Sequence, residues 1–195
     1  MINENIILLA QKGDHQAFQR LVEEFHAVAW RTARVLLRDP ALAEDVLQEA
    51  WIDAWRGLPR LRHPETFRSW LLSVVANRCL MTLRRSVPAT VSLENGLDAL
   101  ALPGETGDAL AQVLRQETST DLHAAVAALP VEQQRVLELR YFADLELSEI
   151  ALVTSLPLGT VKSRLHRALN ALRASLQTEP SAHAKKGTSG YEYTR

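Results

Sequence analysis

Three carboxylates stand four residues apart in the first third of the chain, at Asp45, Glu49 and Asp53. Residues at this spacing lie on one face of a helix, so the pattern predicts a ridge of negative charge. Each like-charge pair at this spacing costs about 0.2–0.5 kcal/mol. A basic partner docked on the ridge would offset that cost, but a ridge that is only solvated is also common. The spacing leaves both interpretations open.

A second group of charges lies near the C-terminal end, where residues 150–178 contain four basic residues and no acidic one. Apolar residues at helical spacing (161, 165, 168, 169, 172 and 176) predict a helix whose opposite face is exposed. The side chains of that face are of the types that reach base edges and phosphates, and they are Lys162, Ser163, His166, Arg167, Asn170 and Arg173. Thr160 and the unpaired N–H groups of the helix start suit a phosphate, whereas Arg164 suits a phosphate or a protein partner. A solvated basic helix without a ligand is the alternative.

The segment between these two groups is strongly basic. Residues 54–85 carry seven arginines against a single acid, and such local patches attract polyanions although the whole chain has a formal net charge of −1. Phe67 and Trp70 could stack unpaired bases, but both fall in an apolar helical stripe, which favours the protein core. The polar members are the better candidates for DNA contacts: Arg60, Arg62, His63, Arg68, Asn77, Arg78, Arg84 and Arg85.

The sequence contains no pattern typical of a catalytic site. Its six histidines are isolated from one another, and there is no glycine-rich phosphate loop or nucleophile elbow. The single cysteine, Cys79, can form neither an internal disulfide nor a cysteine-based zinc site, and without a partner cysteine it is a poor redox switch. We therefore predict no enzymatic activity, no metal and no cofactor.

Composition and helix signals set the scaffold that must position these residues. The chain has 195 residues, is 47% hydrophobic and 23% charged, and has no run of about 18 apolar residues, so we expect a globular, cytoplasmic protein without a membrane span. The short apolar run Ile6–Ala10 lacks the flanks of a secretory signal. Asp14 and Asp39-Pro40 are typical helix starts, and Gly57 is a typical helix end.

These signals predict an all-α fold of two small helical domains joined by a flexible linker. Residues 1–86 form the first domain, and residues 87–118, which contain Pro and Gly without a sustained period, form the linker, with a helical turn near 110–114. As a flexible coil this linker spans about 30 Å, and fully extended about 105 Å. Residues 119–177 form the second domain, in which a helix that includes Tyr141, a short helix near 147–153, a turn and a basic helix starting at Pro157 make a helix-turn-helix. Residues 178–195 are predicted to be disordered.

Three motifs, one of them made of several short stretches, resemble bacterial RNA polymerase sigma factors of the extracytoplasmic-function (ECF) type. Residues 39–51 (DPALAEDVLQEAW) resemble the polymerase-binding region 2.2, and 67–71 (FRSWL), 76–78 (ANR) and Arg84-Arg85 resemble regions 2.3 and 2.4. Residues 159–168 (GTVKSRLHRA) are similar to the recognition helix of region 4.2. The three occur in the family's order, and the resemblance covers about residues 13–85 and 121–176.

The resemblance implies an alternative sigma factor that directs promoter-specific transcription initiation. Its region 2 would dock on the clamp helices of the largest subunit of core RNA polymerase through Asp45, Val46, Gln48, Glu49 and Asp53. The polar residues of 60–85 named above would recognise and help open the −10 element. Region 4 would meet the flap of the second subunit and read the −35 element through Thr160, Lys162, Ser163, Arg164, His166 and Arg167. An anti-sigma factor is a further possible partner.

Four positions depart from the family pattern. Trp51 stands where phenylalanine is usual, and Met81 where aspartate is frequent. Glu146 replaces a serine N-cap, with an expected cost of about 1 kcal/mol, and Ser155 replaces a turn glycine. From the residues alone, three competitors remain: a dimeric helix-turn-helix regulator, a helical adaptor that binds only proteins, and a nucleic-acid-processing enzyme. A dimeric regulator would have no use for the acidic ridge. An adaptor that binds only proteins would have no use for the basic helix without acidic residues.

Overall fold

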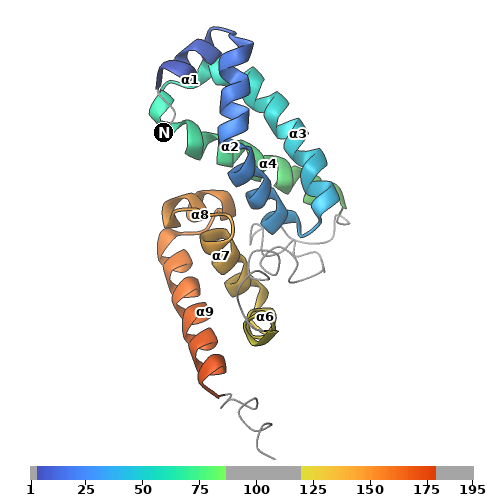
Figure 1. Cartoon of the computed structure of the whole chain (residues 1–195), viewed down its shortest axis with the longest axis vertical. Helices are drawn as coiled ribbons and strands as arrows, with labels where there is room; N and C mark the ends of the chain where they lie inside the picture. The colour runs from blue at the N-terminus through green and yellow to red at the C-terminus, as the bar shows by residue number, and fades with distance from the viewer. Residues whose placement is uncertain (1–3, 87–119, 179–195) are drawn as a thin grey trace, which may run out of the picture.

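A computed structural model describes residues 4–86 and 120–178, and every regular element within these two ranges is helical (Figure 1). The predicted linker, its turn near 110–114 and most of the predicted tail lie outside the described residues. The elements of the first range are α1 (Glu4–Gln11), α2 (His15–Leu37), α3 (Pro40–Gly57), the 3₁₀ turns η1 (Leu58–Arg60) and η2 (Pro64–Thr66), and α4 (Phe67–Ser86). Those of the second are α6 (Thr120–Ala127), α7 (Val131–Tyr141), α8 (Leu147–Thr154) and α9 (Leu158–Thr178).

The first domain is a bundle of α2, α3 and α4, with α1 packed against α2. The predicted helix starts are confirmed: Asp14 Oδ1 accepts from the backbone N–H groups of Gln16 (2.8 Å) and Ala17 (3.0 Å), and Asp39 Oδ1 accepts from that of Leu42 (3.1 Å). Helix α1 adds to the predicted set: Ile7 and Ala10 of its short apolar run are buried against this bundle, whereas Leu8 and Leu9 are exposed.

Gly57 does not end its helix in the way that the sequence predicts. Its φ of −86° is ordinary, and the chain continues directly into η1. A β-carbon at this position would lie 3.0 Å from the indole of Trp70. Gly57 is therefore needed for the close approach of the α4 side chain and not for a left-handed cap.

The second domain contains the predicted helix-turn-helix, in which α7, α8 and α9 pack on one another. Ser155, the residue that replaces the turn glycine, ends α8 in the left-handed region with a φ of 57°. Glu146 forms a capping box with Glu149, whose carboxylate accepts the Glu146 N–H at 2.9 Å. The expected loss of the cap at Glu146 was therefore wrong, since an acidic residue supplies it here.

Two further details of this domain differ from the sequence prediction. Tyr141, which the predicted helix includes, is 57% exposed, because α7 ends there and buries Phe142 instead. Helix α9 begins at Leu158, one residue after the predicted start, and the carbonyl of Pro157 accepts from the N–H groups of Thr160 (2.9 Å) and Val161 (3.1 Å).

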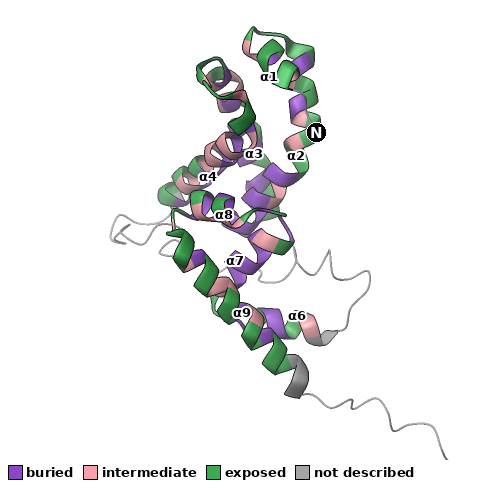
Figure 2. Cartoon of the chain, turned by 90° about the vertical axis from the view of Figure 1, so that its left-hand side faces the viewer, coloured by how far each residue is buried: buried purple, intermediate pink, exposed green. Residues whose placement is uncertain are grey.

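The two domains pack against each other through α2 with α7 and α4 with α8. One continuous set of buried apolar residues runs through both, as the burial colouring in Figure 2 shows. Within the described residues the two domains are therefore in contact, whereas the sequence predicted only that a flexible linker joins them.

Candidate protein- and nucleic-acid-binding surfaces

The acidic ridge predicted on residues 45–53 lies on α3 and faces solvent in part. Asp45, Gln48 and Glu49 are exposed, and Asp53 is half-buried. Val46, which the family resemblance assigns to partner binding, is 3% exposed and packs in the core. In this conformation Val46 supports the ridge from beneath and offers no surface to a partner.

An arginine of the neighbouring helix pairs with two of the three ridge carboxylates. Arg78 of α4 donates from Nε to Asp53 Oδ2 (2.6 Å) and from Nη1 to Glu49 Oε2 (2.9 Å). The hydrogen bond to Asp53, with the negative charges of Asp53 and Glu49, raises the pKa of Arg78 against the effect of burial. Part of the repulsion within the ridge is thus offset inside the chain. No ion pair involves Asp45 among the described residues.

The candidate −10 residues form two groups at opposite ends of α4. Arg60, Arg62 and His63 are exposed on the 3₁₀ segment before the helix, whereas Asn77, Arg84 and Arg85 are exposed in its second half. At 1.5 Å per residue, the seventeen residues from 67 to 84 separate the groups by about 25 Å. Arg68 lies beside the first group and Arg78 beside the second, and both side chains are engaged within the protein.

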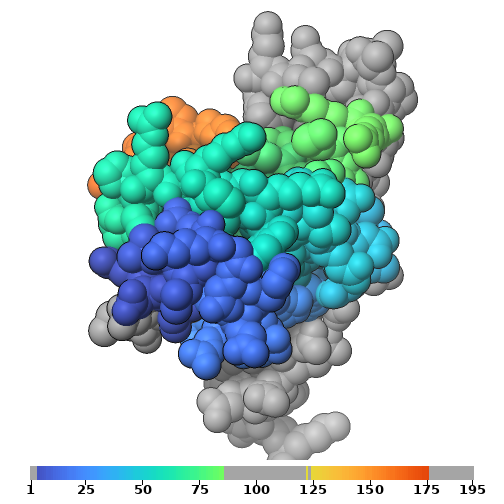
Figure 3. All heavy atoms as spheres, turned by 90° about the horizontal axis from the view of Figure 1, so that it is seen from above, coloured from blue at the N-terminus to red at the C-terminus, as the bar shows by residue number. Residues whose placement is uncertain are grey.

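The first group sits on a loop that α1 holds in place. Gln11 Nε2 donates to the carbonyls of Leu58 (3.1 Å) and Leu61 (2.6 Å), and the ring of His63 contacts Glu65 Oε1 at 3.0 Å. Figure 3 looks onto this end, where α1 in dark blue and the teal segment around residues 58–70 form one continuous surface. Phe67 is 1% exposed, which confirms its predicted place in the core.

The exposed face of α9 carries the candidate −35 residues. Lys162, Ser163, His166 and Arg167 are exposed, and Thr160 and Arg164 are half-buried. The buried side of the helix includes Val161, Ala168 and Leu172, as the apolar stripe predicts, although the residues 165 and 169 are only half-buried.

Hydrogen bonds link three polar side chains along the exposed face of α9. Arg173 can only donate, so its 3.4 Å contact makes Asn170 Oδ1 the acceptor. Asn170 Nδ2 then donates to His166 Nε2 at 2.9 Å.

Residues 4–86 and 120–178 were also compared with the requirements of a metal site and of a membrane span. No three His, Cys, Asp or Glu side chains gather there as a metal site would require. Nor does any described helix combine the length and apolar character of a membrane span.

Comparison with known proteins identifies the family. Residues 21–87 match sigma-70 region 2, and residues 119–172 match sigma-70 region 4. The RNA polymerase sigma-H factor of Pseudomonas aeruginosa is 32% identical over 187 residues, covering 90% of this chain and 94% of the relative. The ECF sigma factor SigL of Mycobacterium tuberculosis is 34% identical over 179 residues, which are 86% of this chain and 93% of SigL. The chain belongs to the ECF group of RNA polymerase sigma factors.

A solved structure supports the fold of this sigma factor. The structure of CnrH in complex with the cytosolic domain of CnrY covers 91% of this chain and 98% of that chain, with a TM-score of 0.58 at 22% identity. The family assignment shows an alternative sigma factor that directs promoter-specific transcription initiation.

The sequence did not reveal which residues of the sigma factor join region 2 to region 4. Arg68 pairs with Glu149 (2.8 Å), and Arg38 pairs with Glu138 (3.7 Å) and Gln134 (3.3 Å). The sequence did contain one signal: Glu138 in α7 and Glu149 in α8 are acidic residues among apolar neighbours. Both are buried in the structure. Burial raises the pKa of Glu138, an effect that the charge of Arg38 opposes.

Proposed function

We propose that this ECF sigma factor binds core RNA polymerase through the acidic ridge of α3 and contacts promoter DNA through two separate surfaces. Asp45, Gln48 and Glu49 would meet the clamp helices of the largest subunit, with Asp53 and Val46 shaping the ridge from within. The 3₁₀ segment and α4 would recognise and help open the −10 element. Helix α9 would read the −35 element as duplex while region 4 meets the flap of the second subunit.

The exposed face of α9 is the observation that supports this proposal most directly. It follows the short helix α8 through a tight turn, its first three turns expose Lys162, Ser163, His166 and Arg167, and no acidic residue interrupts them. A helix of this kind enters the major groove with its N-terminal residues toward the base edges. Lysine and arginine side chains pair with the acceptor edge of guanine, and the exposed His166 ring can hydrogen-bond to a base edge.

Transcription in vitro tests the polymerase-binding ridge. Purified chain and core polymerase are incubated with genomic fragments, and RNA 5′ ends are mapped. Asp45→Arg should abolish both co-purification with core and the mapped starts, because it reverses the charge of the exposed acid outside the Arg78 network. Glu24→Arg, a charge reversal at an exposed position of α2, is the matched control and should transcribe normally. Equal activity of the two variants would contradict the ridge assignment.

A second pair of variants tests the recognition face of α9. Arg167→Ala should weaken binding to the mapped −35 fragment by about 1–3 kcal/mol if the guanidinium reads a base edge. Arg173→Ala removes the same charge six residues further along α9, about 9 Å from Arg167, and should cost less. Equal losses in both variants would show that α9 contributes charge without base readout.

The remaining parts of the proposal concern regulation and place of action. We infer that the chain is not itself catalytic, acts in the cytoplasm, and is held inactive by an anti-sigma factor. The inferred anti-sigma factor would be a protein that co-purifies with the chain and suppresses the mapped starts in the transcription assay. A chain that initiates at full level whenever it is expressed, with no such protein bound, would contradict this inference.

A further inference from the structure

Three of the candidate −10 residues lie on the short connection between α3 and α4. Arg60, Arg62 and His63 are exposed, and residues 61–63, between the two 3₁₀ turns, belong to no helix. A side chain that recognises a ligand has to be held within about 0.5 Å of its productive position, and a loop does this less precisely than a helix. Recognition of bases from this connection therefore requires bonds that fix its backbone.

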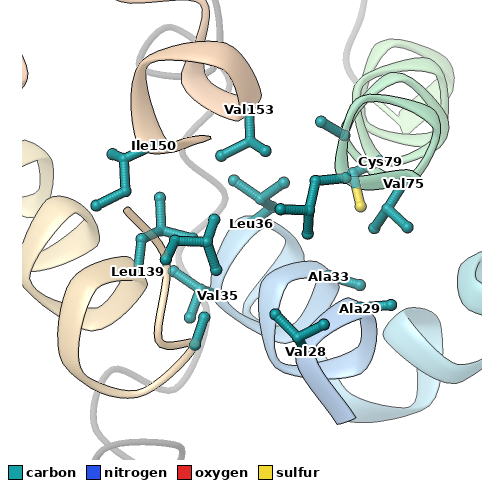
Figure 4. Close-up of a cluster of buried hydrophobic side chains, with 14 of the residues drawn as sticks. Val28, Ala29, Ala33, Val35, Leu36, Val75, Cys79, Leu139, Ile150 and Val153 are labelled. Carbon is teal, nitrogen blue, oxygen red and sulfur yellow. The ribbon is translucent and has the colours of Figure 1, made fainter. Parts of the chain in front are cut away.

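The helices around the connection form a tightly packed frame. Ala29 and Ala33 of α2 lie beside Val75 and Cys79 of α4 in a buried cluster, and all four are 0% exposed (Figure 4). Helix α3 packs on both α2 and α4. The two ends of the connection are therefore fixed, and the backbone between them is the part that needs further support.

A side chain of α1 supplies this support at the middle of the connection. Local bonds hold its ends, because the Leu61 N–H donates to the Leu58 carbonyl at 3.0 Å. The Thr66 N–H (3.0 Å) and Oγ1 (2.7 Å) both donate to the His63 carbonyl. Gln11 Nε2 donates to the carbonyls of Leu61 (2.6 Å) and Leu58 (3.1 Å), which are 50 and 47 residues away. Since a carbonyl only accepts, both N–H groups of the amide are used, one on each carbonyl.

Gln11 is itself held in place by the turn that follows it. Gly13 has a φ of 92°, which glycine adopts without strain, and its N–H donates to the carbonyl of the buried Ala10 at 3.0 Å. Immediately after the turn, the ring of His15 stacks on that of Trp55 with a centroid distance of 4.8 Å. The end of α1 and the start of α2 are therefore fixed against the end of α3, where the connection begins.

The family match assigns no role to this part of the chain. Residues 21–87 match sigma-70 region 2, so α1 precedes the match. We propose that Gln11 is a positioning residue for −10 recognition, whose amide fixes the connection in the backbone conformation in which its exposed side chains meet the bases. This inference rests on the proposed function, because it needs those side chains to be DNA ligands. That Gln11 fixes the backbone does not depend on that assignment.

Loss of the two Gln11 bonds should lower base selectivity more than total affinity. The attraction of an arginine to phosphates falls slowly with distance and survives a mobile backbone, whereas a hydrogen bond to a base edge requires a narrow geometry. Two neutral hydrogen bonds change the ratio of held to released backbone about tenfold, and the affinity for the matched bases follows the fraction that is held. The preference for the matched −10 strand should therefore fall by up to about tenfold.

Three variants test the proposal. Gln11→Met keeps the length of the side chain and removes both donors. Gln16→Met is the matched control, because it makes the same chemical change at an exposed position of α2, five residues further on. Gln11→Lys restores donors, since an ammonium group can donate to both carbonyls. Its added charge strengthens binding to any DNA strand and cancels in a ratio of two affinities.

Hydrogen exchange of the Leu61 N–H, followed by NMR in the full chain, measures whether the backbone is held. Gln11→Met should speed this exchange about tenfold, Gln16→Met should match the wild type, and Gln11→Lys should exchange more slowly than Gln11→Met. The Leu58 N–H donates to the Ala54 carbonyl at the end of α3, and its exchange should be the same in every variant. That second amide distinguishes local release of the connection from unfolding of the domain.

Base selectivity is measured on the holoenzyme, reconstituted from each chain and core polymerase. Fluorescence anisotropy gives its affinity for a single-stranded oligonucleotide with the −10 sequence mapped by transcription and for one with the same bases scrambled. The ratio of the two affinities should follow the protection of the Leu61 N–H across the wild type and the three variants. Affinity for a duplex that carries only the −35 element should be the same in all four.

Each failure points to a different part of the proposal. Unchanged exchange of the Leu61 N–H in Gln11→Met would show that the amide does not fix the backbone, whether or not the chain is an active sigma factor. Selectivity that does not follow the protection of this N–H would reduce Gln11 to a structural residue and overturn its positioning role. Absence of any defined RNA start from the wild-type holoenzyme would count against the proposed function and hence against a DNA role for Gln11, while the exchange rates would still decide whether it fixes the connection.

Discussion

Replacing Arg78 by methionine removes the positive charge that joins α4 to the acidic ridge and keeps much of the aliphatic stem. Arg78 and Asp53 are 23% and 33% exposed, so their hydrogen bond is partly shielded from water, and its loss should cost about 1.5 kcal/mol, the lower end for bonds to charged groups. Glu49 is 56% exposed, and its pair should add at most a few tenths. Repulsion released between Glu49 and Asp53 adds about 0.2–0.5 kcal/mol.

The expected total is about 2 kcal/mol of unfolding free energy, which corresponds to a Tm lower by about 4–8 °C for a chain of this size. Urea unfolding followed by far-UV circular dichroism measures this change in the free energy of unfolding. Arg84→Met, at an exposed arginine of the same helix, is the control and should change stability by less than about 0.5 kcal/mol. If Arg78→Met were as stable as that control, the ion pairs would not be formed in solution and the physical account of the ridge would be wrong.

The same variant separates two roles for Arg78. If Arg78 only neutralises the ridge, Asp53→Asn and Arg78→Met should have similar effects on promoter affinity, because both break the same pair. If Arg78 also contacts DNA, promoter affinity should fall in Arg78→Met alone. The double variant would then bind DNA like Arg78→Met, and its stability would show whether the two side chains interact.

Three further predictions concern buried groups. Cys79 is fully buried and burial raises the pKa of its thiol to about 12, so Ellman's reagent at pH 8 should react only as the chain unfolds; rapid reaction of the native protein would contradict the packing. The pKa of Glu138 is higher in the folded chain than its ordinary 4.5, so stability should fall as pH rises from below 4.5 through the raised value. Glu138→Gln should remove that dependence in urea unfolding between pH 4 and 7, and an unaltered slope would show that another group titrates. Trp51 Nε1 is buried without an acceptor among the described residues, so Trp51→Phe should change stability by only about 1 kcal/mol, and a loss above about 3 would indicate an acceptor that the structure does not show.

Local features of the fold could be predicted because their causes lie within a few residues. An aspartate before a helix caps N–H groups two and three residues ahead, so Asp14 and Asp39 mark helix starts wherever the rest of the chain lies. The apolar stripe of α9 likewise identifies its exposed face. The role of Gly57 was misread because its reason is the indole of Trp70, thirteen residues away, and not the local backbone.

Pairings between distant residues could not be predicted from charge patterns. The spacing of Glu49 and Asp53 showed that the ridge needs a counter-charge, but seven arginines follow in residues 54–85 and nothing local selects Arg78. Arg68 was a candidate for DNA because it is an arginine in a basic segment, and its partner Glu149 is 81 residues further along. Charge composition identifies what a surface can attract, whereas packing decides which charges are still available.

That distinction changes how the basic surface of region 2 should be interpreted. Two arginines among its eight candidate DNA ligands, Arg68 and Arg78, are paired with carboxylates of the protein, and they differ in what would release them. Arg78 is paired inside region 2, so separation of the domains leaves its bonds intact. Arg68 is paired across the domain contact, so the same separation frees it. Each arginine that neutralises a DNA phosphate makes the slope of the logarithm of the binding constant against the logarithm of the salt concentration more negative by about 0.9.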